Sequence, residues 1–301
     1  MLMFLGLARA AGAAPCGDED PAQAVRTDVG FLASPALDGR AVGSTGDAAA
    51  RAYIAERFAC LGLVPAFPDG YAQGFVVTEG TTANLVGYIE GTDAAVRDEI
   101  ILVSAHHDHL GAGHLGANDN ASGIAALLEI ARTLRASRPR RTIAFAAFGA
   151  EETGMQGSYF YAAHPATALS AERIVQVINL DMVGSHRSRG IVAAMGTFAH
   201  LAATPILRRL AKQYPKLNVA LGGKARGSDF EPFCKQGTPY VFFWTPDKAC
   251  YHGTCDKVGR IDWKRMIDIT ALAGDLVAAL AATEVDLAAT KQRFGCDGKN
   301  R

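Results

Sequence analysis

Five side chains of metal-binding types stand in short polar motifs spread along the chain. They are His106 in SAHHDHLG, Asp119 in GANDNASG, Glu152 in FGAEETG, Asp181 in NLDMVG and His252 in CYHGTC. Imidazole nitrogens and carboxylate oxygens, without thiolates, suit zinc or a similar divalent ion. One catalytic zinc ion uses three protein ligands, so five ligands suit two ions that share Asp119 as a bridge. The residue types therefore predict a centre for two metal ions.

Four short apolar runs predict the strands that would position these ligands. A continuous apolar run is typical of a strand buried on both faces, and such runs occupy residues 100–105, 141–149, 173–180 and 239–244. Each strand is followed by one ligand: His106 after the first, then Glu152, then Asp181, with His252 in the loop after the fourth. Asp119 precedes a predicted helix at 121–136. Open α/β sheets bind metals and substrates beyond the carboxyl ends of their strands, so all five side chains are expected at one rim of the sheet.

The alternation of strands and helices predicts the fold. Amphipathic helices are expected at 121–136, near 199–213 and at 263–283, and strands at 71–77 and 83–91 are expected to be antiparallel neighbours at a sheet edge. This pattern predicts an α/β fold with a mostly parallel mixed central sheet and helices on both faces. No break in composition separates two cores, so residues 16–301 are expected to form a single domain.

Composition and the N-terminal segment limit the partners and the compartment. Lys plus Arg and Asp plus Glu both number 30, so no broad charge favours nucleic acid or an anionic membrane. Residues 1–15 are apolar and then rich in small residues, which predicts a signal remnant too short to span a bilayer. The six cysteines agree with export to the periplasm or outside the cell. A disulfide between Cys250 and Cys255 is one expected pair, and the pairing of the others stays open.

Each motif also has an ordinary structural interpretation. Asp119 and Ser122 could cap a helix, and Glu151 with Glu152 could lie in a first helical turn facing the helix dipole. Asp181 is harder to explain in this way, because a carboxylate next to a buried strand needs a partner. If each motif had only this structural role, all of these residues would stand in the correct order by chance.

The chain resembles peptidase family M28, the two-zinc aminopeptidases, from roughly residue 28 to residue 284. The motifs that carry the resemblance are His-x-Asp, Asp-Asn-x-Ser-Gly, Glu-Glu, Asp and Tyr-His, present in this order. The segment LASPALDGRAVGSTGD is similar to one that precedes the catalytic part in bacterial members. The resemblance implies a zinc-peptidase-like three-layer sandwich with two Zn²⁺ per chain.

The resemblance also implies a role for individual residues. His106, Asp119 and Asp181 would hold one zinc ion, and Glu152 and His252 the other, with Asp119 bridging. Asp108 would orient His106. Glu151 would be the general base, and Tyr251 would help to stabilise the oxyanion.

The sequence departs from the family pattern in two places. His107 stands where relatives commonly have Tyr and is expected to be a wall of the site, while His109 and His114 are expected in the loop or behind the ligands. The segment from Arg226 to Phe230 reads Arg-Gly-Ser-Asp-Phe instead of Arg-Ser-Asp-His, which leaves the contact of Arg226 with substrate open. Ser228 and Asp229 are expected to cap a helix.

The expected activity is hydrolysis of the first peptide bond of a peptide with a free N-terminus, by a chain expected to be monomeric and not inserted in a membrane. Carboxypeptidase or dipeptidase activity on the same metal centre is one alternative. A glutaminyl-cyclase-like acyl transferase is another, and the full ligand set with Asp119 and His106 disfavours it. A binding protein without catalysis would have no chemical need for Glu151.

Overall fold

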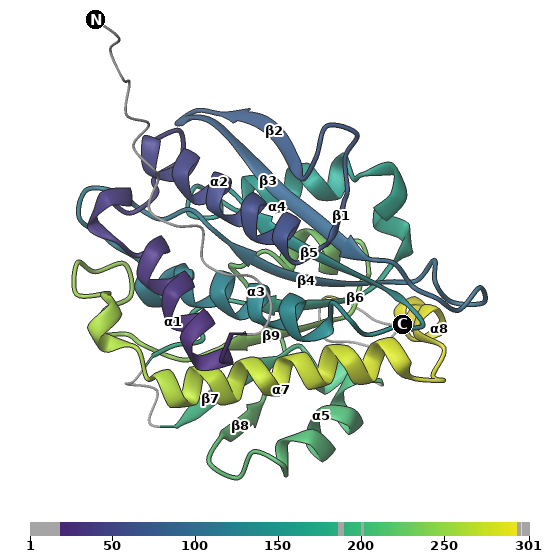
Figure 1. Cartoon of the computed structure of the whole chain (residues 1–301). Helices are drawn as coiled ribbons and strands as arrows, with labels where there is room; N and C mark the ends of the chain where they lie inside the picture. Colours follow the sequence, from purple (N-terminus) through teal and green to yellow (C-terminus); the bar gives the residue numbers. More distant parts are fainter. Residues whose placement is uncertain (1–18, 186–189, 200–201, 294–295, 297–301) are drawn as a thin grey trace, which may run out of the picture.

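A mixed β-sheet forms the middle layer of the computed structural model, which describes residues 19–185, 190–199, 202–293 and 296 (Figure 1). The nine strands of this described part run in the order β1-β3-β5-β4-β6-β9-β7-β8, with β2 paired to β3. The expected signal segment 1–15 and Cys16 lie outside the described residues.

Four parallel strands make the centre of the sheet: β4 (Ile100–His106), β5 (Thr142–Phe148), β6 (Ile174–Leu180) and β9 (Tyr240–Trp244). Side chains alternate between the two faces of a strand, so a strand covered on both faces needs apolar residues throughout. In β4, Ile101 and Val103 pack in one hydrophobic core, and Ile100 and Leu102 pack in the other. The continuous apolar runs therefore predicted these strands correctly.

The remaining strands extend the sheet at its two edges. On one side, β3 (Gly80–Ile89) is antiparallel to β5, and it pairs in turn with β1 (Val64–Pro65) and β2 (Ala72–Val77). On the other side, β7 (Ile191–Met195) is antiparallel to β9, and β8 (Asn218–Leu221) is parallel to β7. The prediction of a mixed sheet with a parallel centre is confirmed.

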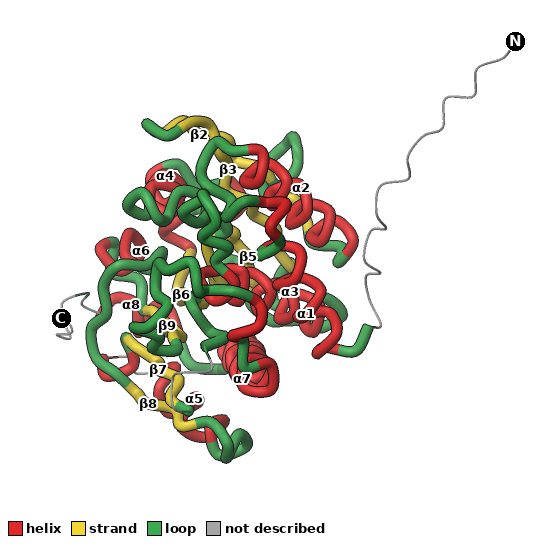
Figure 2. The backbone as a smooth tube through the Cα atoms, turned by 90° about the vertical axis from the view of Figure 1, so that its left-hand side faces the viewer, coloured by secondary structure: helices red, strands yellow, loops and turns green. Residues whose placement is uncertain are grey.

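Helices cover both faces of the sheet, which gives three layers (Figure 2). The larger core lies under α1 (Pro21–Leu32), α2 (Thr45–Cys60), α3 (Ser122–Leu134), α5 (Ala203–Ala211) and α7 (Trp263–Ala282). The smaller core on the opposite face lies under α4 (Gln156–Ala163) and α6 (Glu231–Lys235). A last short helix, α8 (Leu287–Arg293), follows α7.

Two disulfides between described residues tie loops to this framework. Cys250 and Cys255 are bonded across the loop that carries His252, as expected, and Cys234 in α6 is bonded to Cys296. Among the described helices, none combines the length and apolar character that crossing a bilayer requires.

Candidate metal centre

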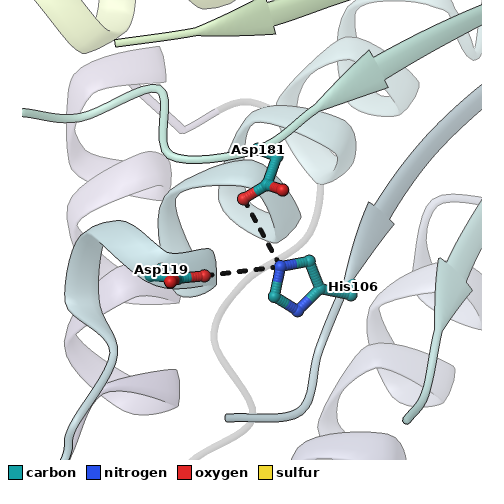
Figure 3. A group of neighbouring side chains, drawn as sticks. All are labelled: His106, Asp119 and Asp181. Atoms are coloured by element: carbon teal, nitrogen blue, oxygen red, sulfur yellow. Dashed lines mark hydrogen bonds and ion pairs between the residues drawn. The ribbon is translucent and has the colours of Figure 1, made fainter. Parts of the chain in front are cut away.

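Three of the predicted ligands meet at the carboxyl ends of β4 and β6 (Figure 3). His106 is the last residue of β4, Asp181 directly follows β6, and Asp119 lies just ahead of α3. The Nε2 atom of His106 is 3.4 Å from Asp119 Oδ1 and 3.4 Å from Asp181 Oδ1. We refer to His106, Asp119 and Asp181 as the first triad.

The other two ligands lie on the opposite side of Asp119. His252 Nε2, in the loop after β9, is 3.4 Å from Asp119 Oδ2 and 3.0 Å from Glu152 Oε2. We refer to His252, Glu152 and Asp119 as the second triad. Because each oxygen of Asp119 faces a different histidine, the structure brings all five residues together with Asp119 shared.

The spacing of these atoms fits two metal ions. Ligand atoms 2.0–2.1 Å from one tetrahedral zinc ion lie about 3.3 Å from each other, close to the separations in both triads. Asp119 and Asp181 are only 3% and 8% exposed. Carboxylates held away from water need a compensating positive charge. The residues present therefore suit a pair of divalent cations.

The electrostatics of the first triad favour the ionised form of Asp119. Burial alone would raise the pKa of Asp119, but hydrogen bonds from His106 and His252 lower it well below its usual range. Burial opposes protonation of His106, yet the carboxylates of Asp181 and Glu151 outweigh it and raise the pKa of His106. Each imidazole is thus held in a strongly negative environment, which is where a cation would bind.

Asp108 holds the loop of the paired glutamates. Its Oδ1 accepts a hydrogen bond from the Glu151 amide at 3.1 Å, and its Oδ2 accepts one from the Glu152 amide at 3.2 Å. The same carboxylate lies 3.8 Å from His106 Nδ1, while the backbone oxygen of Asp108 lies closer, at 3.3 Å. Asp108 therefore contacts both ligand-bearing segments, not His106 alone.

Glu151 and Tyr251 lie beside the triads without being part of them. Burial raises the pKa of Glu151 to about 10, with Asp229, Asp181 and Asp108 adding to the shift and His106 opposing it. Tyr251 is exposed, and its ring stacks on His252 with 3.8 Å between the centroids. Burial of its hydroxyl and the nearby carboxylates raise the pKa of Tyr251 to about 12.

A pocket of about 420 Å³ opens next to Asp181 and Tyr251. Its walls are largely apolar and include Met182, Met195, Phe242 and Trp244. Arg226 also lines this pocket, so the guanidinium that the sequence left open lies near the candidate site.

The three histidines near His106 have different surroundings. The Nε2 atom of His107 lies 3.0 Å from the Ala83 backbone oxygen, and its Nδ1 lies 3.6 Å from Asp47, so this ring faces β3 and α2 and not the triads. His114 Nδ1 faces the backbone oxygen of Gly111 at 3.0 Å. His109 Nδ1, in contrast, is 2.6 Å from Glu152 Oε1.

The expectation that Ser228 and Asp229 cap a helix is wrong. The N-cap of α6 is Phe230, with no side-chain hydrogen bond, and Asp229 is fully buried. Ser228 Oγ donates instead to Asp181 Oδ2 at 2.8 Å and accepts from Asn179 Nδ2 at 2.7 Å. A helix cap would use the hydroxyl oxygen to accept from a helix amide, but here Asn179 supplies that donor and Asp181 accepts the hydroxyl proton. Ser228 thus fixes the predicted ligand Asp181.

The role of Asp256 in the site was not predicted from the sequence. Asp256 is 4% exposed and accepts hydrogen bonds from the amides of Asn118 at 2.8 Å and Asp119 at 2.9 Å. It directly follows Cys255, four residues after His252. Its place directly after CYHGTC was the available signal, but the sequence does not show which amides it would meet.

Comparisons with known proteins agree with this geometry. The sequence model of peptidase family M28 matches residues 84–277, which is more than half of the chain. Aminopeptidase YwaD of Bacillus subtilis is 31% identical over 212 residues, which cover 67% of this chain and 44% of YwaD. Aminopeptidase Y of Saccharomyces cerevisiae is 29% identical over 227 residues, which cover 71% of this chain and 40% of that protein. The chain thus spans less than half the length of these curated relatives.

Solved structures give the same grouping. The zinc aminopeptidase BSAP from Bacillus subtilis matches with a TM-score of 0.60 and 26% identity, over 70% of this chain and 53% of that one. A glutaminyl cyclase from Porphyromonas gingivalis matches with a TM-score of 0.68 at 20% identity, over 84% of this chain and 97% of that one, which shows a shared fold alone. From the family match and the curated relatives, we conclude that the chain belongs to peptidase family M28.

Proposed function

We propose that the protein is an aminopeptidase that hydrolyses the first peptide bond of a peptide with a free N-terminus. The observation that carries this proposal is the pair of triads joined through Asp119, with Glu151 beside them. His106, Asp119 and Asp181 would hold one zinc ion, and Glu152, His252 and Asp119 the other. Membership of the family and the aminopeptidases among its relatives support the same activity.

Bound zinc ions would polarise the scissile carbonyl group and lower the pKa of a water molecule in the site. Glu151 is suited to accept the proton of the attacking water and to deliver it to the leaving amine. Burial raises its pKa, so the carboxylate would be a strong proton acceptor once the positive charge of bound metal ions favours its ionised form. Glu152, whose Oε2 faces His252, would be occupied as a ligand and leave this task to its neighbour.

Tyr251 is suited to stabilise the oxyanion that forms when the carbonyl is attacked. A pKa of about 12 keeps its hydroxyl protonated at neutral pH, so it can donate a hydrogen bond. The ring lies over His252 and lines the apolar pocket next to Asp181. If the carbonyl of the first peptide bond lies at the second triad, the side chain of the substrate's N-terminal residue would therefore enter that pocket. The Met and Trp walls of the pocket suit an apolar side chain.

The charge of the site favours a free amino group on the substrate. Three carboxylates belong to the triads and three more lie beside them, and two divalent cations would favour the ionised form of all six while offsetting four of their charges. They are those of Asp108, Asp119, Glu151, Glu152, Asp181 and Asp229. The remaining negative charge would attract an α-ammonium group and repel a C-terminal carboxylate, which favours an aminopeptidase over a carboxypeptidase.

We also propose an exported monomer with one catalytic domain at 16–301. The disulfides Cys234–Cys296 and Cys250–Cys255 support an oxidising compartment, and strands from both halves of the chain join one sheet. Light scattering of the purified protein tests the monomer.

The activity is tested with aminoacyl-nitroanilides and matched N-acetylated substrates. We expect cleavage of the free substrates only, about two zinc ions per chain, and loss of activity with a chelator. The variant Glu151→Gln should retain both metals and lose about 10²–10⁴-fold in turnover, the usual contribution of a general base. Equal rates on acetylated substrates would point to another hydrolase class, and full turnover of the variant would remove Glu151 from the role of base.

A further inference from the structure

His109 lies inside the candidate metal centre without being one of the five expected ligands. It is 2% exposed, and its ring packs against Gly116, where an added Cβ would lie 2.6 Å from His109 Cδ2. Its Nδ1 atom is 2.6 Å from Glu152 Oε1, and its ring meets that of His252 edge to face with 6.0 Å between the centroids. The ring is therefore fixed next to the second triad.

Two roles are compatible with this position. His109, Asp119 and Glu152 each offer an atom within 4.8 Å of the others, so His109 could be a further ligand of the ion held by the second triad. Alternatively, its Nδ1–H could donate a hydrogen bond to Glu152. The two roles differ in the distance that they require between Nδ1 and Oε1.

The observed distance distinguishes the two roles. Two atoms bound to the same tetrahedral zinc ion lie about 3.3 Å apart. His252 Nε2 meets that requirement, at 3.0 Å from Glu152 Oε2 and 3.4 Å from Asp119 Oδ2. The 2.6 Å between His109 Nδ1 and Glu152 Oε1 is too short for it and matches a hydrogen bond to a carboxylate.

We propose that His109 is a positioning residue that holds Oε1 of Glu152 and leaves Oε2 for the metal ion. This inference rests on the metal centre of the proposed function. It assigns His109 to the second triad alone, since the described contacts of its ring are with Glu152, His252 and Gly116. The second triad needs such support, because the His252 side chain is 37% exposed and lies on a loop.

The test compares His109→Phe with His109→Asn. Asn places an amide nitrogen at the same distance along the side chain as Nδ1, so it can keep the donor, whereas Phe removes it. Metal-free protein is titrated with zinc against a chromophoric chelator, and the two dissociation constants are read without substrate. We expect His109→Phe to weaken one of the two sites by about 10–100-fold, the usual effect of losing a hydrogen bond to a ligand, and His109→Asn to restore it to within a few-fold.

The matched control is His114→Phe, in the same loop, whose Nδ1 faces a backbone oxygen and no ligand. This variant should leave both dissociation constants unchanged. His109→Gln moves the amide nitrogen one carbon further and should not restore the affinity, which keeps the test decisive if His109→Phe fails to fold. Circular dichroism reports folding for every variant.

Three results would overturn the inference. The first is folded His109→Phe with both zinc affinities equal to those of the wild type. The second is a zinc affinity in His109→Asn as weak as in His109→Phe or His109→Gln. The third is equal weakening of both zinc sites. Failure of the proposed function is distinguishable, because it would appear as wild-type protein that binds two zinc ions and cleaves no peptide. In that case the comparison of the His109 variants would still stand.

Discussion

Asp256 offers a direct test of how the bridging residue Asp119 is held. Its carboxylate is buried, with one oxygen accepting from the Asn118 amide and the other from the Asp119 amide. The change Asp256→Asn keeps the shape and volume of the side chain. It replaces one acceptor oxygen with an NH₂ group, which cannot accept a hydrogen bond from an amide.

The expected loss of stability in Asp256→Asn follows from the loss of one buried hydrogen-bond acceptor. An amide left without a partner costs about 1–3 kcal/mol, while the neutral Asn removes the burial penalty that raises the pKa of Asp256. We therefore expect the free energy of unfolding of the metal-free protein to fall by about 1–3 kcal/mol, which corresponds to a decrease in Tm of roughly 2–5 °C at an unfolding entropy of about 2.1 cal/mol/K per residue. Because Asp119 faces both His106 and His252, both zinc affinities should decrease together.

The control for Asp256→Asn is the same change at Asp262. This residue caps α7, and its Oδ1 accepts from the Arg265 amide at 3.1 Å. One acceptor is enough at that position, and Asn caps helices as well as Asp, so the cost should stay below about 0.5 kcal/mol. Thermal unfolding in the presence of a chelator and zinc titration are measured for both variants. If Asp256→Asn melts within about 1 °C of Asp262→Asn (roughly the effect of 0.5 kcal/mol) with normal zinc affinities, Asp256 does not hold the loop of Asp119.

Three further outcomes follow from other contacts. Ser228→Ala removes the donor to Asp181 Oδ2 and should weaken zinc binding at the first triad by about 10-fold or more while sparing the second, as read by zinc titration. Burial raises the pKa of Asp28 from 3.8 to about 6, so the folded chain binds this proton more tightly than the unfolded chain does. The stability that the protonated Asp28 gives the folded chain is complete below pH 4 and is lost as the pH rises through 6. Urea unfolding should therefore show wild-type stability falling by about 3 kcal/mol relative to Asp28→Asn over this range, and a pH-independent difference would contradict the assignment. Replacing Cys234 and Cys296 together with Ala should lower the free energy of unfolding by about 4 kcal/mol in urea, because the disulfide closes a loop of 62 residues, and a loss below 1 kcal/mol would show that this constraint is unimportant.

The sequence predicted where the proposed ligands lie in the fold because a strong and local physical rule applied to the strands that carry them. A strand between two helical layers must be apolar on both faces, so β4 and β6 could be identified from their residues, and their ends located His106 and Asp181. The same reasoning placed Glu152 after β5. It required no knowledge of how the loops fold.

The partners of the ligands could not be predicted in this way. Ser228 is the third residue before Glu231, which satisfies the sequence pattern of a helix cap, yet its hydroxyl bonds a carboxylate 47 residues away in the chain. Asp256 bonds amides more than 130 residues away. A short polar side chain has several partners of similar strength, and only the path of the loops decides which one it reaches.

The structure also shows that the ligand loops hold one another in place. Asp108, two residues after the proposed ligand His106, accepts the amides of the glutamate pair, and Asp256, four residues after the proposed ligand His252, accepts the amide of Asp119. Each of these buried carboxylates would lose both of its amide hydrogen bonds if the neighbouring loop moved. A buried acid without partners is costly, so displacement of one ligand segment must disturb the next. The centre is therefore expected to form as a unit, with the bridging residue Asp119 as the point through which the two triads depend on each other.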